Sequence, residues 1–253
     1  MVEKQGMAKK PFIVSVTSGK GGVGKTFISI NLAATLAKAG KKILVVDCDL
    51  GLANIDIMLG INPQHTLQDV IFGNKGLKDI IVPTKGGFDL IPSRSGVREM
   101  AQLLFEKIGL IKSNILSFTD YDVILLDTGA GISEVVLQFN LLASKNIVII
   151  NRELTCLTDA YSMIKVMFQV FGREASSIVV NSVADEKEAE RLFSHIDSIC
   201  TNFLGFPLHQ IGYIARDDAV PKSILKQEIA VLTAPQSSLA QNFHRIAETV
   251  LSW

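Results

Sequence analysis

A glycine- and lysine-rich stretch near the N-terminus contains residue types that bind phosphate. Residues 18–26 are SGKGGVGKT and match the pattern G-x-x-x-x-G-K-[ST] from Gly19 to Thr26. In such a loop the backbone N–H groups close around phosphate oxygens, and the positive end of the following helix adds to the attraction. We expect Lys25 to reach the β- and γ-phosphates of a nucleotide and the Thr26 hydroxyl to face Mg²⁺.

The segments on either side of this stretch favour a phosphate-binding loop over an ordinary glycine-rich turn. Residues 11–17 form a short apolar run suited to a buried strand, and residues 27–39 carry apolar side chains at the spacing of one helix face. The predicted nucleotide-binding residues are those of the loop and the first helical turn: Gly19, Lys20, Gly21, Gly22, Val23, Gly24, Lys25, Thr26 and Phe27.

Carboxylates follow two further apolar runs. Asp127 ends the run 123–127 and precedes a glycine-rich turn, which is typical of an aspartate that supports Mg²⁺ beside bound phosphates, although such a residue can also cap a turn. Asp47 and Asp49 follow the run 43–46 and alternate by two, so both point the same way if the strand geometry persists. One could bind Mg²⁺ through water while the other orients the attacking water. The predicted metal set is Thr26, Asp47, Asp49 and Asp127.

Apolar strand-like runs alternate with helical patterns along the 253 residues, with no internal repeat or linker. This alternation predicts an α/β fold with a single doubly wound, mostly parallel sheet and helices on both faces. We expect one domain over residues 11–253, preceded by a flexible tail over residues 1–10. The remaining strands are expected at 88–92, 147–150, 177–181 and 207–214, and the remaining helices at 66–72, 100–118, 133–143, 158–171, 185–200, 217–225 and 237–251.

The composition excludes several classes of protein. Lysine plus arginine and aspartate plus glutamate are both 25, so the net charge is zero and no strong nucleic-acid signal is present. The three cysteines form no C-x-x-C, which disfavours a cysteine metal site and fits reduced thiols. No apolar run reaches the length of a membrane span, and residues 1–10 lack the apolar core of a signal peptide. We therefore expect a cytoplasmic protein.

A second lysine, Lys20, lies inside the loop. The run 20–26 resembles the deviant Walker A motif of the MinD/ParA class of ATPases. The segment 47–56 resembles the switch I segment of MinD-like proteins, and its GLAN sequence at 51–54 is most similar to the flagellar branch called FlhG, FleN or YlxH. The segment 127–132 resembles switch II of that branch. The resemblance implies a P-loop NTPase fold of the SIMIBI class, with ATP and Mg²⁺ as cofactors.

The resemblance also implies catalytic roles for three residues of this chain. Lys20 would reach across a dimer to the nucleotide of the partner subunit, and Lys25 would contact the phosphates. Asp49 would polarise the attacking water, with Asp47 and Asp127 supporting Mg²⁺.

Further positions are implied to lie beside the nucleotide or the partner subunit. Asn181 matches the position whose side-chain amide reads adenine, and it could instead simply end a strand. Glu153 and Asp159 lie on the strand-to-helix segment that faces the partner subunit, where a helix-capping role is equally open for both. The residues after Asn181, at 182–184, lack the lysine and aspartate that read guanine, which disfavours a GTPase.

The implied function is that of an ATP-dependent homodimeric switch with slow Mg²⁺-dependent hydrolysis to ADP and phosphate. It would control flagellar number or placement through a flagellar transcription activator or a signal-recognition-type GTPase. A MinD-type division-site regulator, a ParA-type partition ATPase and a non-enzymatic nucleotide sensor are the alternatives.

Membrane association is disfavoured because the helix expected at 237–251 lacks a basic face. A transient stay at the inner membrane or the cell pole is left open. We expect the apolar stripe of this helix to dock on the core: Leu239, Phe243, Ile246, Val250 and Trp253.

Overall fold

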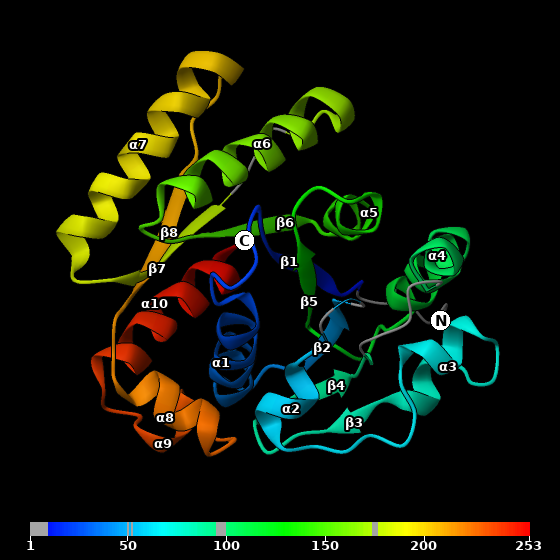
Figure 1. The fold of residues 1–253 in the computed structure, drawn as a ribbon. Helices are drawn as coiled ribbons and strands as arrows, with labels where there is room; N and C mark the ends of the chain where they lie inside the picture. The colour runs from blue at the N-terminus through cyan, green and yellow to red at the C-terminus, as the bar shows by residue number, and fades with distance from the viewer. Residues whose placement is uncertain (1–9, 50, 52, 95–99, 174–176) are drawn as a thin grey trace, which may run out of the picture.

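A twisted eight-stranded sheet forms the centre of the molecule (Figure 1). The computed structural model describes residues 10–49, 51, 53–94, 100–173 and 177–253, with the backbone only at 100–106. The strand order is β3-β4-β2-β5-β1-β6-β7-β8, and all neighbours are parallel except the edge pair β3 and β4. The expected doubly wound, mostly parallel sheet is confirmed. The strands are β1 (Phe12–Ser18), β2 (Ile43–Cys48), β3 (Val82–Pro83), β4 (Asp89–Ile91), β5 (Val123–Ala130), β6 (Lys145–Ile150), β7 (Ser177–Val183) and β8 (His209–Ala215).

Helices cover both faces of the sheet (Figure 1). The long helices α1 (Lys25–Lys38) and α10 (Ser238–Ser252) lie on one face. The other face carries α4 (Met100–Leu116), α5 (Glu134–Leu142), α6 (Leu154–Phe171) and α7 (Glu186–Leu204). Shorter elements complete the chain: α2 (Ile55–Leu59), α3 (Leu67–Ile71), the 3₁₀ helix η1 (Leu77–Ile80), α8 (Ala219–Leu225) and α9 (Ala230–Thr233).

The central strands are buried on both faces, which explains their continuous apolar sequences. All of β2 is buried, and β5 is buried up to Gly129. Helix α1 is apolar on most of its circumference because it is packed between the sheet and α10. The core therefore holds the carboxyl ends of β1, β2 and β5 in fixed relative positions.

Several element boundaries differ from the prediction by a few residues, and two of these differences bear on the site at the edge of the sheet where ligands of such folds bind. Strand β5 does not end at Asp127 but continues to Ala130, because it pairs with β2 on one side and with β1 on the other. Helix α6 begins at Leu154 rather than at Thr158, so Asp159 lies inside the helix and cannot cap its start. Four short elements, α2, η1, β3 and α9, were not predicted because they are too short to show a periodic pattern.

The last helix docks on the core, as its stripe of apolar residues predicts. Leu239, Phe243, Ile246 and Val250 are all buried, and the ring of Trp253 lies 6.2 Å from that of Phe12. Within the part of the chain that the structure describes, no helix is long and apolar enough to cross a membrane. The predicted tail lies outside the described residues, apart from Lys10.

Candidate functional site

The glycine-rich loop connects β1 to α1 at the carboxyl edge of the sheet. Gly22 and Gly24 have φ values of 77° and 97°, a region that favours glycine. Gly24 occupies the N-cap position of α1, so the N–H groups of Lys25, Thr26 and Phe27 lie in the first turn, where they have no partner inside the helix. Such a cluster of N–H groups at a helix N-terminus is suited to binding phosphate.

The loop packs tightly against α6 at its first glycine. A Cβ atom on Gly19 would lie 2.2 Å from the backbone carbonyl carbon of Asp159. Only a residue without a side chain fits there. By contrast, a Cβ atom on Gly21 would meet nothing within 4 Å.

A buried charge cluster lies at the start of α1. Asp127 is fully buried, and this burial raises its pKa to about 6. The Ser29 hydroxyl donates to Asp127 Oδ1 at 2.8 Å, and the Thr26 hydroxyl also hydrogen bonds to this carboxylate. Burial lowers the pKa of Lys25, while Asp127 and Asp49 oppose that shift. The loop lysine, the helix hydroxyl and the strand carboxylate thus converge.

The carboxylates at the end of β2 belong to the same cluster. Asp47 lies directly opposite Asp127 in the β2–β5 register, and its pKa is well above the ordinary value because of burial and the charge of Asp127. The Asp49 N–H donates to Asp47 Oδ1 at 3.1 Å. A Cβ atom on Gly129 would lie 3.5 Å from Asp49 Oδ1, so Asp49 lies against β5. The structure therefore brings together the aspartates that were predicted to bind the metal and to orient water. Leu50 and Leu52, in the segment that follows, lie outside the described residues.

These residues fit a Mg²⁺ ion held together with phosphates. Among the described residues, no three acidic, histidine or cysteine side chains are placed to close a metal site by themselves. Mg²⁺ is usually held by one or two carboxylates together with phosphate oxygens and waters, so such a closed set is not required. The raised pKa values of Asp47 and Asp127 indicate buried carboxylates in need of a compensating cation.

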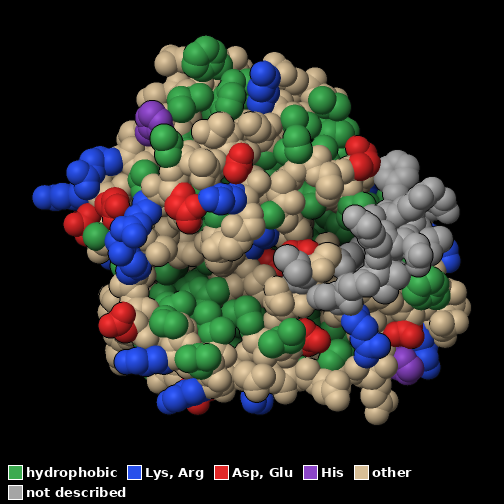
Figure 2. Space-filling model, viewed as in Figure 1, with side chains coloured by type: hydrophobic (Ala, Val, Ile, Leu, Met, Phe, Trp, Pro, Cys, Tyr) green, Lys and Arg blue, Asp and Glu red, His purple; other side chains and the backbone are tan. Residues whose placement is uncertain are grey.

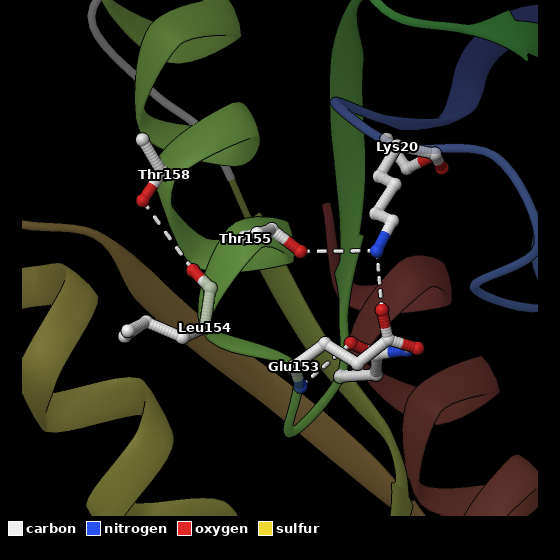
Figure 3. A network of polar contacts seen from close by, with 7 residues as sticks. Lys20, Glu153, Leu154, Thr155 and Thr158 are labelled. Atoms are coloured by element: carbon white, nitrogen blue, oxygen red, sulfur yellow. Dashed lines mark hydrogen bonds and ion pairs between the residues drawn. The ribbon is translucent and has the colours of Figure 1, made fainter.

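Lys20 is bound within its own chain, on the side of the loop that faces α6 (Figure 3). Its Nζ forms an ion pair with Glu153 and donates to the Thr155 hydroxyl at 3.0 Å. The hydrogen bond to Glu153 raises the pKa of Lys20, and the same bond lowers the pKa of Glu153. Glu153 occupies the N-cap position of α6, but its side chain makes no capping hydrogen bond. The position of the Glu153 side chain is therefore explained by its ion pair with Lys20 and not by helix capping.

Asn181 and Phe27, the two remaining residues predicted to bind nucleotide, have different surroundings in the structure. The side-chain amide of Asn181 donates to the Val23 carbonyl at 2.7 Å, so Asn181 contacts the phosphate loop directly. The Phe27 ring is buried against Phe243, with ring centroids 6.0 Å apart. Phe27 can therefore offer a ligand only its backbone, and its side chain belongs to the core.

Several polar residues of the site were not predicted. Ser29 follows Thr26 by one helical turn on the same face, a signal hidden by the apolar residues around it. Thr155 and Asn151 lie two residues to either side of Glu153. The backbone N–H of Glu153 donates to the side-chain oxygen of Asn151 at 3.0 Å. Only the packing of distant segments brings Ser29 to Asp127 and Thr155 to Lys20.

Comparisons with known proteins agree with this geometry. Residues 14–231 match the family model of the CobQ/CobB/MinD/ParA nucleotide binding domain. The chain is 36% identical over 242 residues to the antiactivator FleN of Pseudomonas aeruginosa, covering 95% of this chain and 86% of that protein. It is 32% identical over 246 residues to the flagellum site-determining protein YlxH of Helicobacter pylori, covering 94% and 81%.

A solved structure shows the same fold. The septum site-determining protein MinD of Pyrococcus horikoshii, complexed with Mg-ADP, matches with a TM-score of 0.79 and 27% identity, covering 95% of this chain and 96% of that one. The family model spans most of the sequence, and the relatives match almost from end to end. The chain therefore belongs to the CobQ/CobB/MinD/ParA family of nucleotide-binding proteins.

Proposed function

We propose that this protein is a Mg²⁺-dependent ATPase that acts as a switch. ATP binding would produce a face-to-face homodimer, and slow hydrolysis to ADP and phosphate would return it to monomers. The observation that carries this proposal is the convergence of Lys25, Thr26 and Asp127 behind the glycine-rich loop. In P-loop NTPases these groups hold the phosphates and Mg²⁺ beside a positioned water.

Each side chain of the cluster has a distinct task in this proposal. Lys25 is desolvated, so its charge acts on phosphate oxygens more strongly than a charge in water. Thr26, Asp47 and Asp127 would hold Mg²⁺, which neutralises charge on the phosphates. Asp49, less buried than Asp47, would orient the attacking water. The partly exposed Lys20 would contact the nucleotide of the second subunit.

The surface around the site supports a dimer formed through this face. Four large apolar side chains are exposed on segments that follow strand ends at the same edge of the sheet: Ile57 in α2, Ile132 after β5, Leu154 in α6 and Leu225 in α8. Figure 2 shows a broader gathering of hydrophobic side chains on this face, around α8 and the neighbouring parts of α1 and α10. Apolar surface in such a place is suited to burial by another protein.

The mass of the protein in solution tests this proposal. Light scattering should give a monomer with ADP and Mg²⁺ and a dimer with ATP and Mg²⁺, and phosphate release should accompany the return to monomer. A monomer under saturating ATP would contradict the dimer. A dimer in both nucleotide states would contradict the switch.

The output we propose is control of flagellar number or placement. This rests on the similarity to proteins named as an antiactivator and as a flagellum site-determining protein. One nucleotide state would bind a flagellar transcription activator or a signal-recognition-type GTPase. Deleting the gene should change the number or position of flagella seen by electron microscopy. Normal flagella together with division or plasmid-loss defects would favour a MinD-type or ParA-type role instead.

We further propose a cytoplasmic location, with contact at the inner membrane or the cell pole made through partners. The docked α10 keeps its apolar stripe against the core and so presents no apolar face to lipid. Co-sedimentation with anionic liposomes in the presence of ATP should leave the protein in the supernatant. A DNA mobility shift at low and high salt should likewise show no binding, since the net charge is zero.

A further inference from the structure

Asn181 contacts the part of the phosphate loop that directly precedes α1. Its Nδ2–H donates to the Val23 carbonyl at 2.7 Å, although the two residues are distant in sequence. A Cβ atom on Gly24 would lie 2.3 Å from Asn181 Nδ2. The amide therefore occupies the space that a side chain on Gly24 would need. Asn181 and the loop are packed together as closely as sterics allow.

The hydrogen bond fixes the orientation of one peptide group of the loop. A trans peptide is planar, and its C=O and N–H point in opposite directions. The described residues contain no cis peptide bond, so holding the Val23 carbonyl toward Asn181 turns the Gly24 N–H away from it. Among the described residues the Gly24 N–H makes no backbone hydrogen bond. It is available to a phosphate oxygen next to the N–H groups of the first turn of α1.

The backbone around Asn181 is built to hold this side chain in place. Ser182 has a φ of 58°, which is unusual for a residue with a side chain, and the β7–β8 register shifts between Asn181 and Val183. A bulge of this kind re-aims the neighbouring side chain. Strain of this type persists only where the surrounding structure enforces it, and it concentrates at functional sites.

We infer that Asn181 is a positioning residue for the phosphate loop, in addition to any contact with the base. It would hold the Val23–Gly24 peptide in the orientation that binds triphosphate. The side-chain oxygen makes no hydrogen bond within the described residues and could accept one from the exocyclic amine of a base. One side chain would then couple recognition of the base to the shape of the phosphate site. This inference rests on the proposed nucleotide binding.

A ligand without a base separates the two roles of Asn181. Calorimetric titration with Mg-ATP and with Mg-tripolyphosphate would be carried out on the wild type and on Asn181→Ala, with Asn202→Ala on the exposed face of α7 as control. Loss of one hydrogen bond should weaken tripolyphosphate binding by about tenfold, which equals ~1.4 kcal/mol. The control should bind both ligands as the wild type does. Thermal melting would confirm that each variant is folded.

The pH profile of Asn181→Asp gives a readout that a change in packing would not move. An ionised carboxylate cannot donate to the Val23 carbonyl, whereas a protonated one can. As the pH falls toward the ordinary aspartate pKa of about 4, the ratio of wild-type to variant affinity for tripolyphosphate should shrink. A ratio independent of pH would contradict a positioning role.

The wild-type protein supplies a measurement that does not depend on the folding of any variant. Hydrogen exchange of the Asn181 side-chain amide, followed by NMR, should slow when tripolyphosphate binds. Tripolyphosphate affinity unchanged in Asn181→Ala, with ATP affinity reduced, would overturn the inference and leave Asn181 as a reader of the base only. Failure of the wild type to bind either ligand would instead overturn the proposed function.

Discussion

Lys20 Nζ is held in an ion pair by Glu153 of the same chain, and the Thr155 hydroxyl supports it at 3.0 Å. The lysine expected to serve a second subunit therefore has partners in the isolated subunit (Figure 3). Both charged side chains are partly exposed, so the pair is screened by solvent and contributes little to stability. The pair could be broken at small cost in the proposed dimer, which would make Lys20 available to the opposite nucleotide.

Replacing Lys20 by alanine should separate nucleotide binding from dimer formation. Lys20→Ala should still bind Mg-ATP, because Lys25 and the first turn of α1 remain, but it should stay monomeric and lose ATPase activity. Light scattering and phosphate release measure the two outcomes. Full ATPase activity in this variant would show that the lysine has no role across the interface.

Removing the charge of Glu153 should make dimer formation easier. In Glu153→Gln, Lys20 loses its intramolecular ion pair, so half-maximal dimerisation should require less ATP than in the wild type. High salt should reduce the difference, because it screens the pair in the wild type. Glu190→Gln, an exposed change on α7, should behave as the wild type. If Glu153→Gln needed more ATP, Glu153 would instead be a contact of the dimer.

Asp49→Ala should trap the ATP-bound state. The buried residues Lys25 and Asp127 would still bind Mg-ATP, while the variant lacks the carboxylate beside β5 that we propose orients the attacking water. We expect hydrolysis to be at least about a hundredfold slower, since general base or water-positioning groups contribute roughly 10²–10⁴-fold. Dimers should accumulate in chromatography with ATP. Asp120→Ala, at an exposed position before β5, provides a matched control that should retain activity.

Stability in the absence of nucleotide should depend on the ionisation of Asp127. Its folded-state pKa is raised to about 6, so the fold favours the neutral carboxyl. The contribution of the neutral Asp127 carboxyl to the free energy of unfolding is complete below about pH 4 and is lost as the pH rises through the folded pKa. Asp127→Asn avoids this loss, so near neutral pH its free energy of unfolding should exceed that of the wild type by up to about 3 kcal/mol. Denaturant unfolding measures the difference.

Asp127→Asn should also no longer be stabilised by bound nucleotide. Mg-ATP should raise the melting temperature of the wild type and not that of Asp127→Asn. The stability difference between the two nucleotide-free proteins should disappear in acid. Equal stability of the two proteins at all pH values would show that Asp127 is not destabilised by burial.

A methyl group at the first loop glycine should disturb the packing of the loop on α6. In Gly19→Ala the new Cβ would overlap the backbone of Asp159, so the loop or α6 must move. Overpacking of this kind costs about 1–3 kcal/mol, which urea unfolding can measure. Gly21→Ala is the matched control, because nothing lies within 4 Å of its Cβ position. Equal stability of the two variants would contradict the close contact.

The fold class and the phosphate loop could be predicted because their signals are local. The pattern from Gly19 to Thr26 depends on neighbouring residues, and apolar periodicity marks each long strand and helix independently of the rest. The aspartates at the end of β2 and in β5 could be placed at one edge because parallel strands align their carboxyl ends. The amphipathic stripe of the last helix likewise predicted its docking.

Only the tertiary structure decided which of these residues contact one another. The pairs Lys20–Glu153, Val23–Asn181 and Ser29–Asp127 join segments far apart in the chain, and each depends on strand order and on how a helix packs against the sheet. The length of β5 was set by its two neighbours, and no residue within it signals where the strand ends. The sequence by itself determined a phosphate-binding α/β protein, because local patterns specify elements. Packing across the sheet decided which side chains hold the loop in place.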